Sequence, residues 1–415
     1  MNASKLKNII IINDYARVEG GAAKVAISSA LGLALAGYKV SYVFAVGPAS
    51  NDLIHPNIQL IDLKQYDLLD NPSRKDAAIR GVWNSQSYKV IKQYLNNISP
   101  YDTVVHIHTW VKSLSISAVA AVVNSKIPNV LTLHDYFSVC PNGGLYDYQK
   151  ESICHKKPMS LDCVTTNCDA RSYSHKLWRV IRQLAYKRAG FKNGIKNFIS
   201  VSDYSESILK PLLPSTALFW RVGNPIDIKK ASPTTPGNSR YYTYVGRLSA
   251  EKGALLLAKV KSITPDRLRF IGKGEVEEEL MELLPEAEFL GWVDSTQISK
   301  YLYDTRALLF TSRSYETQGL VVLEAAAVGV PAVVASQTSA TDYVTHNKSG
   351  LLFSTGNSAS LDDQLALLEC DDTVNRLGAQ AYDDFWKKPP TLENHVKELV
   401  ICYSDILNQH TDCFK

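Results

Sequence analysis

Short runs of β-branched residues alternate with helical stretches along this chain, and the alternation restricts the fold more than any other feature of the sequence. Segments with helical spacing, such as residues 22–36 and 75–97, separate the runs. In the first half we expect strands at residues 8–12, 39–44, 103–107, 129–133 and 198–201. Strands that alternate with helices predict a parallel sheet covered by helices on both faces.

The alternation stops and then starts again, which divides the chain. The break begins at Gly223-Asn224-Pro225 and includes residues 229–240, whose Pro, Ser, Thr and Gly content is typical of an exposed linker. A last long helix follows Pro389-Pro390. Between these points we expect a helix at 254–262 and strands at 241–245, 269–271, 288–290, 307–310 and 332–335.

We therefore predict an α/β protein with two doubly wound, Rossmann-like domains. The first domain takes residues 1–222 and contains an insertion at 138–198, the second takes residues 223–388, and residues 389–415 form the last helix. In such a pair of domains a ligand binds in the cleft, at the carboxyl ends of the strands.

Composition excludes some classes of function. The chain has 415 residues, of which 45% are apolar and 21% are charged, and its net charge of +4 is too small to argue for nucleic-acid binding. No apolar run approaches the roughly 20 residues of a membrane-spanning helix. The run Ile9–Ile12 is too short for a signal-peptide core. We expect a cytoplasmic protein with reduced cysteines.

Two glycine-containing stretches follow predicted strands of the second domain. In "GRLSAEKG" (246–253), Arg247 and Lys252 are good phosphate partners and precede a helix start. A solvated turn with Lys252 paired to a neighbouring glutamate is the alternative. In Gly272-Lys273-Gly274, the glycines would let a ligand approach the backbone, although an ordinary tight turn is the better explanation of this stretch taken by itself.

Two carboxylates stand in an otherwise apolar stretch, "SYETQGLVVLEAAAVGVPAVVAS". Glu316 precedes Gln318-Gly319-Leu320, where a helix begins and where unpaired N–H groups would hold an anion. Glu324 lies about one and a half turns into that helix and would accept hydrogen bonds from vicinal hydroxyls, as carboxylates do with ribose. A carboxylate paired to a core arginine is the alternative.

The order and spacing of these stretches resemble the nucleotide-sugar half of family 4 glycosyltransferases, which have the GT-B fold. The first domain resembles the same family at Gly20-Gly21, at the start of "GGAAKV", and at Thr132–Asp135, which contains His134. The resemblance covers residues 6–408 apart from the region 140–198. It implies transfer with retained anomeric configuration, catalysis without a metal or other cofactor, and a last helix that crosses back to the first domain.

The resemblance also implies a role for each matching residue. Arg247 and Lys252 would neutralise the departing diphosphate, Glu316 would bind hydroxyls of the donor sugar, and His134 would lie beside that sugar. Glu324 would bind the ribose. The remaining nucleotide-sugar contacts would come from Gly20, Gly21, Gly272, Gly274, Gln318, Gly319 and Leu320. Gln318 stands where many members carry an aromatic residue. The identity of the donor sugar therefore cannot be inferred from better-known relatives.

The insertion concentrates cysteines at positions 140, 154, 163 and 168. Cys140, Cys154, Cys163 and Cys168 in a loop-rich cytosolic segment predict a structural zinc site, with an iron–sulfur cluster as the other metal alternative. The segment lacks a Cys-x-x-Cys knuckle, so unliganded thiols and disulfides remain as alternatives.

Residues 171–198 hold eight Lys or Arg residues and no Asp or Glu. Leu177, Val180, Ile181 and Leu184 fall on one helical face, which predicts an interfacial helix attracted to anionic lipid. The alternative is a helix packed on the core whose basic face is solvated or lines the acceptor cleft.

These observations predict a retaining glycosyltransferase that moves a hexose-type sugar from a nucleoside diphosphate. Its acceptor would be a glycan or a polyprenyl-diphosphate-linked glycan of cell-surface polysaccharide biosynthesis. It would be cytoplasmic, with peripheral contact to the inner face of the plasma membrane, and would not bind nucleic acid. A nucleotide-sugar epimerase and a non-catalytic nucleotide-sugar-binding protein are the alternatives.

Overall fold

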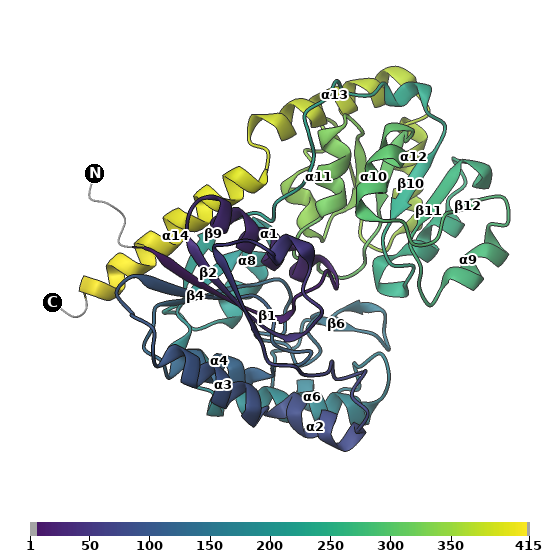
Figure 1. Ribbon diagram of the computed structural model, residues 1–415. Helices are drawn as coiled ribbons and strands as arrows, with labels where there is room; N and C mark the ends of the chain where they lie inside the picture. The colour runs from purple at the N-terminus through teal and green to yellow at the C-terminus, as the bar shows by residue number, and fades with distance from the viewer. Residues whose placement is uncertain (1–5, 413–415) are drawn as a thin grey trace.

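The computed structural model describes residues 6–412, and its larger sheets are two parallel sheets in separate lobes (Figure 1). In the first lobe the strand order is β3-β2-β1-β4-β5-β8-β9. These strands are β1 Asn8–Tyr15, β2 Lys39–Val46, β3 Ile58–Asp62, β4 Thr103–Ile107, β5 Asn129–Thr132, β8 Asn197–Ser200 and β9 Leu218–Arg221. The accompanying helices are α1 Gly21–Leu35, α2 Arg74–Val82, α3 Ser85–Leu95, α4 Ile116–Val123, α7 Phe191–Gly194 and α8 Asp203–Leu209.

The second lobe repeats this plan with the order β12-β11-β10-β13-β14-β15. Its strands are β10 Tyr242–Val245, β11 Leu268–Ile271, β12 Glu288–Phe289, β13 Ala307–Phe310, β14 Ala332–Ala335 and β15 Gly350–Phe353. Its α-helices are α9 Glu277–Leu283, α10 Ser295–Tyr303, α11 Leu320–Ala327, α12 Ser358–Leu367 and α13 Asp371–Lys387. The two doubly wound sheets that the alternation predicted are therefore present.

Strand β1 shows why the first sheet forms. Ile12 pairs with Val43 of β2 and with Ile107 of β4, so β1 is central in the sheet. Helices cover both faces, and the run Ile9–Ile12 is almost completely buried. Parallel strands buried on both faces need unbroken apolar runs rather than alternation.

Two predicted helices differ from the structure for local reasons. The segment predicted as one helix at 75–97 is two helices, because the Asn84 side chain accepts from the Ser87 N–H and starts α3. The helix predicted at 254–262 is the 3-10 helix η5 (Ala254–Lys259). It ends where the N–H groups of Lys261 and Ser262 donate to Asp362 Oδ1 at 2.7 and 2.8 Å.

The last helix, α14 (Leu392–Asp412), lies on the first lobe, as the resemblance implied (Figure 1). Its apolar residues join the cluster formed by β1 and α1. His395 Nε2 lies 2.8 Å from Ser29 Oγ of α1. Its Nδ1 lies 2.8 Å from the carbonyl oxygen of Gly223, at the hinge where the chain enters the second lobe. One imidazole therefore joins α14, α1 and the hinge.

We expect this imidazole to make the protein sensitive to acid. Burial lowers the pKa of His395 from 6.5 to about 4. The unfolded chain therefore takes up a proton between these pH values that the folded chain does not, and stability falls as pH drops from 6.5 towards 4, by about 3 kcal/mol for this group. Urea unfolding at both ends of the range should show this loss, and His395→Gln should reduce it. An equal loss in wild type and variant would contradict the assignment.

The insertion packs against the first sheet's lobe and contains the hairpin β6 (Tyr146–Asp147) and β7 (Ser152–Ile153), with helices α5 (Leu161–Thr165) and α6 (Tyr173–Arg188). The Nζ of Lys176, which is fully buried, lies 3.1 Å from Cys168 Sγ and 3.7 Å from Cys163 Sγ. Within residues 6–412, no group of three or more His, Cys, Asp or Glu side chains is placed to hold a metal. Zinc on the four cysteines stays a prediction, which elemental analysis of the purified protein checks.

The contact between Lys176 and Cys168 predicts a measurable coupling. Cys168→Ala should lower the free energy of unfolding by about 1–3 kcal/mol, because it removes the closer sulfur from a buried ammonium group. Lys176→Met combined with Cys168→Ala should cost less than the sum of the single changes. Additive losses would show that the two side chains do not support each other.

No helix within the described residues is long and apolar enough to span a membrane.

Candidate functional site

The candidate donor site is formed by loops at the carboxyl ends of β10, β11 and β13. Strand β10 leads into Gly246 and Arg247, and the Tyr244 hydroxyl donates to the Arg247 carbonyl at 2.8 Å. The Arg247 guanidinium pairs with Glu251, whose carboxylate is almost buried. Most of the Arg247 side chain remains exposed. Arg247 is therefore held at its backbone by Tyr244 and at its guanidinium by Glu251, while much of its side chain stays exposed.

The predicted ligand-contacting glycines have a structural reason to be glycine. A Cβ at Gly272 would lie 1.9 Å from the Gly246 carbonyl oxygen, and a Cβ at Gly274 would lie 2.0 Å from that of Leu248. The Leu248 N–H donates to the Lys273 carbonyl at 3.0 Å. The two glycines therefore let the loop after β11 pack against the loop that carries Arg247.

Lys252 and Glu316 form a direct ion pair, although 64 positions separate them in the chain. Ser312 Oγ, just after β13, also donates to Glu316 Oε1 at 2.8 Å. The sequence alternative, Lys252 paired with a neighbouring glutamate, is not what the structure shows. The fold thus brings a predicted phosphate-binding cation and a predicted sugar-binding acid together.

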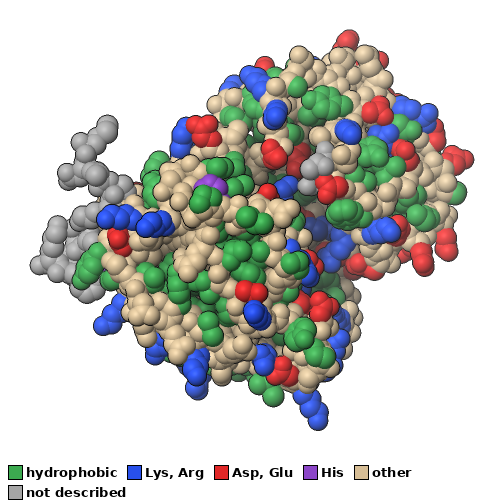
Figure 2. Space-filling model, viewed as in Figure 1, with side chains coloured by type: hydrophobic (Ala, Val, Ile, Leu, Met, Phe, Trp, Pro, Cys, Tyr) green, Lys and Arg blue, Asp and Glu red, His purple; other side chains and the backbone are tan. Residues whose placement is uncertain are grey.

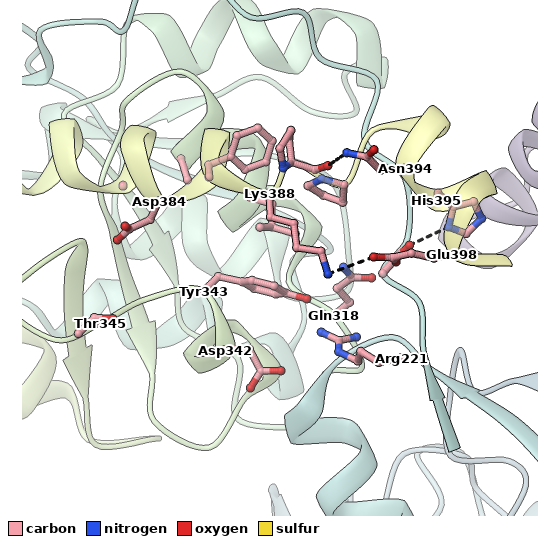
Figure 3. A pocket seen from close by; sticks show the side chains of 17 residues that line it. Arg221, Gln318, Asp342, Tyr343, Thr345, Asp384, Lys388, Asn394, His395 and Glu398 are labelled. Carbon is pink, nitrogen blue, oxygen red and sulfur yellow. Dashed lines mark hydrogen bonds and ion pairs between the residues drawn. The ribbon is translucent and has the colours of Figure 1, made fainter. Parts of the chain in front are cut away.

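The residues at the start of α11 have different surroundings. Gly319 caps the helix without a side-chain hydrogen bond, and Leu320 is its first residue. The Gln318 side chain instead faces the hinge, where its Oε1 accepts from the Asn224 N–H at 3.0 Å. There it lines a cavity of about 490 Å³ together with Arg221, Tyr343 and the Lys388–Glu398 ion pair (Figure 3). Gln318 therefore lies on the hinge in this structure.

Glu324 faces the first lobe across the boundary between the domains. It lines a small cavity of about 60 Å³ with Gly21 and Lys24 of α1. Burial raises the pKa of Glu324, and the nearby Lys24 opposes that rise. At this volume the cavity has room for water but is too small for a nucleoside. Arg247, Lys252 and Glu316 do not line it.

The glycine-rich loop before α1 is open. Gly20 has φ +94°, and a Cβ at Gly20 or Gly21 would meet nothing within 4 Å. The loop therefore has room for a ligand to approach its backbone.

His134 lies in the loop after β5, which meets the Glu316 loop across the cleft. Thr317 Oγ1 donates to the His134 carbonyl at 3.0 Å, and the Tyr136 hydroxyl donates to the Glu316 carbonyl at 3.2 Å. The His134 Nε2 lies 2.8 Å from Nδ1 of His108. Burial, assisted by the charge of His395, lowers the pKa of His134 to about 3. At neutral pH this imidazole is uncharged.

A third cavity, of about 400 Å³, lies in the first lobe at the carboxyl ends of its strands, and of its lining residues only Gly21 was predicted as a site residue. Gly21, Tyr15, Asp67, Lys112 and Asp135 are among its lining residues. Burial raises the pKa of Asp135 to about 6. Asp135 directly follows His134 after a predicted strand, which was the available signal in the sequence. Asp67 and Lys112 stand in segments without a motif.

The insertion also reaches the second lobe. Glu151, at the tip of the β6–β7 hairpin, accepts from Arg313 Nη1 at 2.7 Å through its carboxylate and from Nη2 at 2.8 Å through its carbonyl. Arg313 precedes Glu316 in the loop after β13. The insertion therefore contacts the same loop that carries Glu316, and Figure 2 shows Lys and Arg side chains gathered in the hollow between the two lobes.

Comparisons with known proteins agree with this geometry. Residues 225–384 match the family model described as "Glycosyl transferases group 1". The match falls within the second lobe, which is similar to the domain that this family model describes.

Curated relatives match over limited stretches. A sulfoquinovosyl transferase, SQD2, from Arabidopsis thaliana is 32% identical over 148 residues, which are 34% of this chain and 29% of that protein. A GDP-mannose-dependent alpha-mannosyltransferase from Corynebacterium glutamicum is 28% identical over 116 residues, or 28% of each chain. The chain thus spans less than a third of the length of these relatives.

Solved structures share the whole architecture. Sucrose-phosphate synthase from Thermosynechococcus elongatus superposes with a TM-score of 0.69 at 17% identity, covering 97% of this chain and 100% of that one. HepE from Anabaena, in complex with UDP and glucose, gives a TM-score of 0.65 at 17% identity, covering 96% and 100%. These likenesses confirm the predicted GT-B fold.

Proposed function

We propose that this protein is a family 4 glycosyltransferase that transfers a hexose-type sugar, with retention, from a nucleoside diphosphate to a glycan or lipid-linked glycan of the cell surface. The observation that carries the proposal is the pairing of Lys252 with Glu316 at the ends of β10 and β13. An acid and a cation held together at strand ends fit the junction between a sugar and its diphosphate. HepE, which shares the fold, was crystallised with UDP and glucose.

Each donor-side residue has a role that follows from its chemistry. The Arg247 guanidinium and the Lys252 ammonium bind the diphosphate and stabilise the charge that develops on it. Glu316 accepts hydrogen bonds from sugar hydroxyls once the ligand separates it from Lys252. Glu324 accepts from the ribose hydroxyls, which requires the lobes to part beyond the present 60 Å³ cavity.

The reaction is an exchange of bonds at the anomeric carbon. The bond from that carbon to the diphosphate oxygen breaks, and a bond to the acceptor oxygen forms on the same face. The acceptor proton passes to the departing phosphate. His134, uncharged at neutral pH, contributes a hydrogen bond to the sugar rather than a positive charge. The 400 Å³ cavity with Asp135 holds the acceptor.

The experiment that tests the proposal is a screen of nucleotide sugars for thermal stabilisation and slow donor hydrolysis. We expect one nucleoside-diphosphate sugar to raise the melting temperature and to be hydrolysed. Conversion of the sugar to its epimer without an acceptor would favour the epimerase alternative. Binding without hydrolysis or transfer, with membrane extract supplied, would favour a binding protein.

A further inference from the structure

Helix α6 of the insertion buries several polar side chains and exposes several apolar ones. Lys176, Arg182, Gln183 and Tyr186 are buried, and so is Val180, which the sequence had placed on the apolar outward face. The Arg182 guanidinium donates to the Pro141 carbonyl at 3.1 Å and stacks 4.8 Å from the centre of the Phe137 ring. The helix packs on the core of the first lobe through Tyr186, as the core-packed alternative expected. Its basic residues divide, because Lys176 and Arg182 are buried whereas Lys187 and Arg188 are exposed.

The outward side of α6 carries a continuous apolar stripe. Leu177, Ile181 and Leu184 are 39%, 54% and 58% exposed, and with Tyr173 they recur every three or four residues, which places them on one face. Leu161, at the start of neighbouring α5, is also exposed, and the Tyr173 hydroxyl ties the two helices by donating to the Val164 carbonyl at 3.1 Å. We call Leu161, Tyr173, Leu177, Ile181 and Leu184 the α6 stripe.

A cavity opens at one end of the stripe. Its volume is about 560 Å³, and Leu184 and Leu212, both exposed, are among its lining residues. Lys157, Lys187 and Lys192 also line it, and all three are exposed. An apolar hollow bordered by ammonium groups is suited to a molecule with a hydrocarbon chain and a negatively charged head.

The charge around the stripe is positive and favours a partner that is both apolar and negatively charged. Residues 171–198 contain no Asp or Glu. The acids in the turn before them are occupied, because Asp162 pairs with Lys156 at 2.8 Å and Asp169 with Arg179 at 3.0 Å. The surface is thus apolar along a helix and positive at its border, which is the pattern of interfacial helices on anionic membranes.

We propose that the α6 stripe docks on an anionic phospholipid bilayer and that one lipid of this bilayer enters the lysine-bordered cavity. The leucine and isoleucine side chains enter the interfacial region, while Lys187 and Lys192 lie at the level of the phosphates. This inference goes beyond the proposed function, because it requires neither a donor nor transfer. It would bring the cleft to an acceptor carried on a lipid.

Co-sedimentation with vesicles tests the proposal. We expect the full chain to bind vesicles of phosphatidylcholine with phosphatidylglycerol, and to bind less as salt rises or on phosphatidylcholine alone. Ile181→Ser with Leu184→Ser should lower the partition coefficient at least tenfold, because two exposed aliphatic side chains no longer enter the lipid. Lys187→Glu with Lys192→Glu, which keeps the stripe intact, should abolish the preference for phosphatidylglycerol.

The matched control is Met281→Ser with Leu283→Ser, two exposed apolar residues on α9 of the second lobe. It should bind vesicles as wild type does, and all variants should keep the wild-type melting temperature and donor hydrolysis. Failure of the wild type to bind, wild-type binding by the stripe variant, or equal loss in the control would overturn the proposal. A wild-type dimer that the stripe variant converts to monomer would assign the stripe to a second copy instead.

Discussion

Replacing Lys252 with methionine is expected to lower the turnover number of glycosyl transfer about 100- to 1000-fold, the usual effect of removing one group that stabilises developing charge. Methionine keeps most of the side-chain volume, so the loss reports the ammonium group rather than packing. The donor KM should change much less, because the charge on the diphosphate grows as the bond to the sugar breaks.

Two further measurements sharpen this prediction. Lys300→Met, an exposed lysine on α10 in the same lobe, should keep wild-type turnover. Lys252→Arg should recover part of the activity, since it restores a cation at the site although its geometry differs. If Lys252→Met turns over at the rate of Lys300→Met, Lys252 does not act on the diphosphate.

The second large effect is expected on donor binding. Glu324→Ala should raise the donor KM about 10- to 100-fold with a smaller effect on turnover, because hydrogen bonds from ribose to a carboxylate contribute about 1.5–3 kcal/mol each. Glu324 would contact the nucleotide end of the ligand, away from the bonds that change in the reaction. The matched control is Glu279→Ala, which changes an exposed glutamate on α9.

The same carboxylate should make binding depend on pH. Burial raises the pKa of Glu324, so its charged, hydrogen-bond-accepting form is lost at a higher pH than for an ordinary glutamate. Donor affinity should therefore weaken as pH falls, and Glu324→Gln should flatten that dependence. A wild-type pH profile in the glutamine variant would assign the titration to another group.

The sequence predicted the parts of this molecule that depend on local pattern. The apolar run Ile9–Ile12 gave β1, and Arg247, Lys252 and Glu316 were placed at strand ends because each follows an apolar run before a helix start. The meeting of Lys252 and Glu316 follows from the topology of a parallel sheet, in which carboxyl ends share one edge.

The parts that local pattern did not predict depend on distant partners. The direction of the Gln318 side chain is set by the Asn224 N–H of the hinge, 94 positions away. The inward polar face of α6 is set by carbonyl groups of the insertion, including that of Pro141. The contact of Glu151 with Arg313 joins residues 162 positions apart. No spacing rule links such pairs, because each depends on how loops pack after the sheets have formed.

Titration calorimetry of the nucleoside-diphosphate sugar selected by the donor screen tests the central claim most directly. Wild type should bind one equivalent, Arg247→Ala with Lys252→Met should lose at least tenfold in affinity for the diphosphate sugar, and the corresponding nucleoside, which lacks phosphates, should bind wild type and variant alike. If the variant bound the diphosphate sugar as tightly as wild type, the diphosphate would not lie on these two cations, and the site described at the ends of β10 and β13 would not be the donor site.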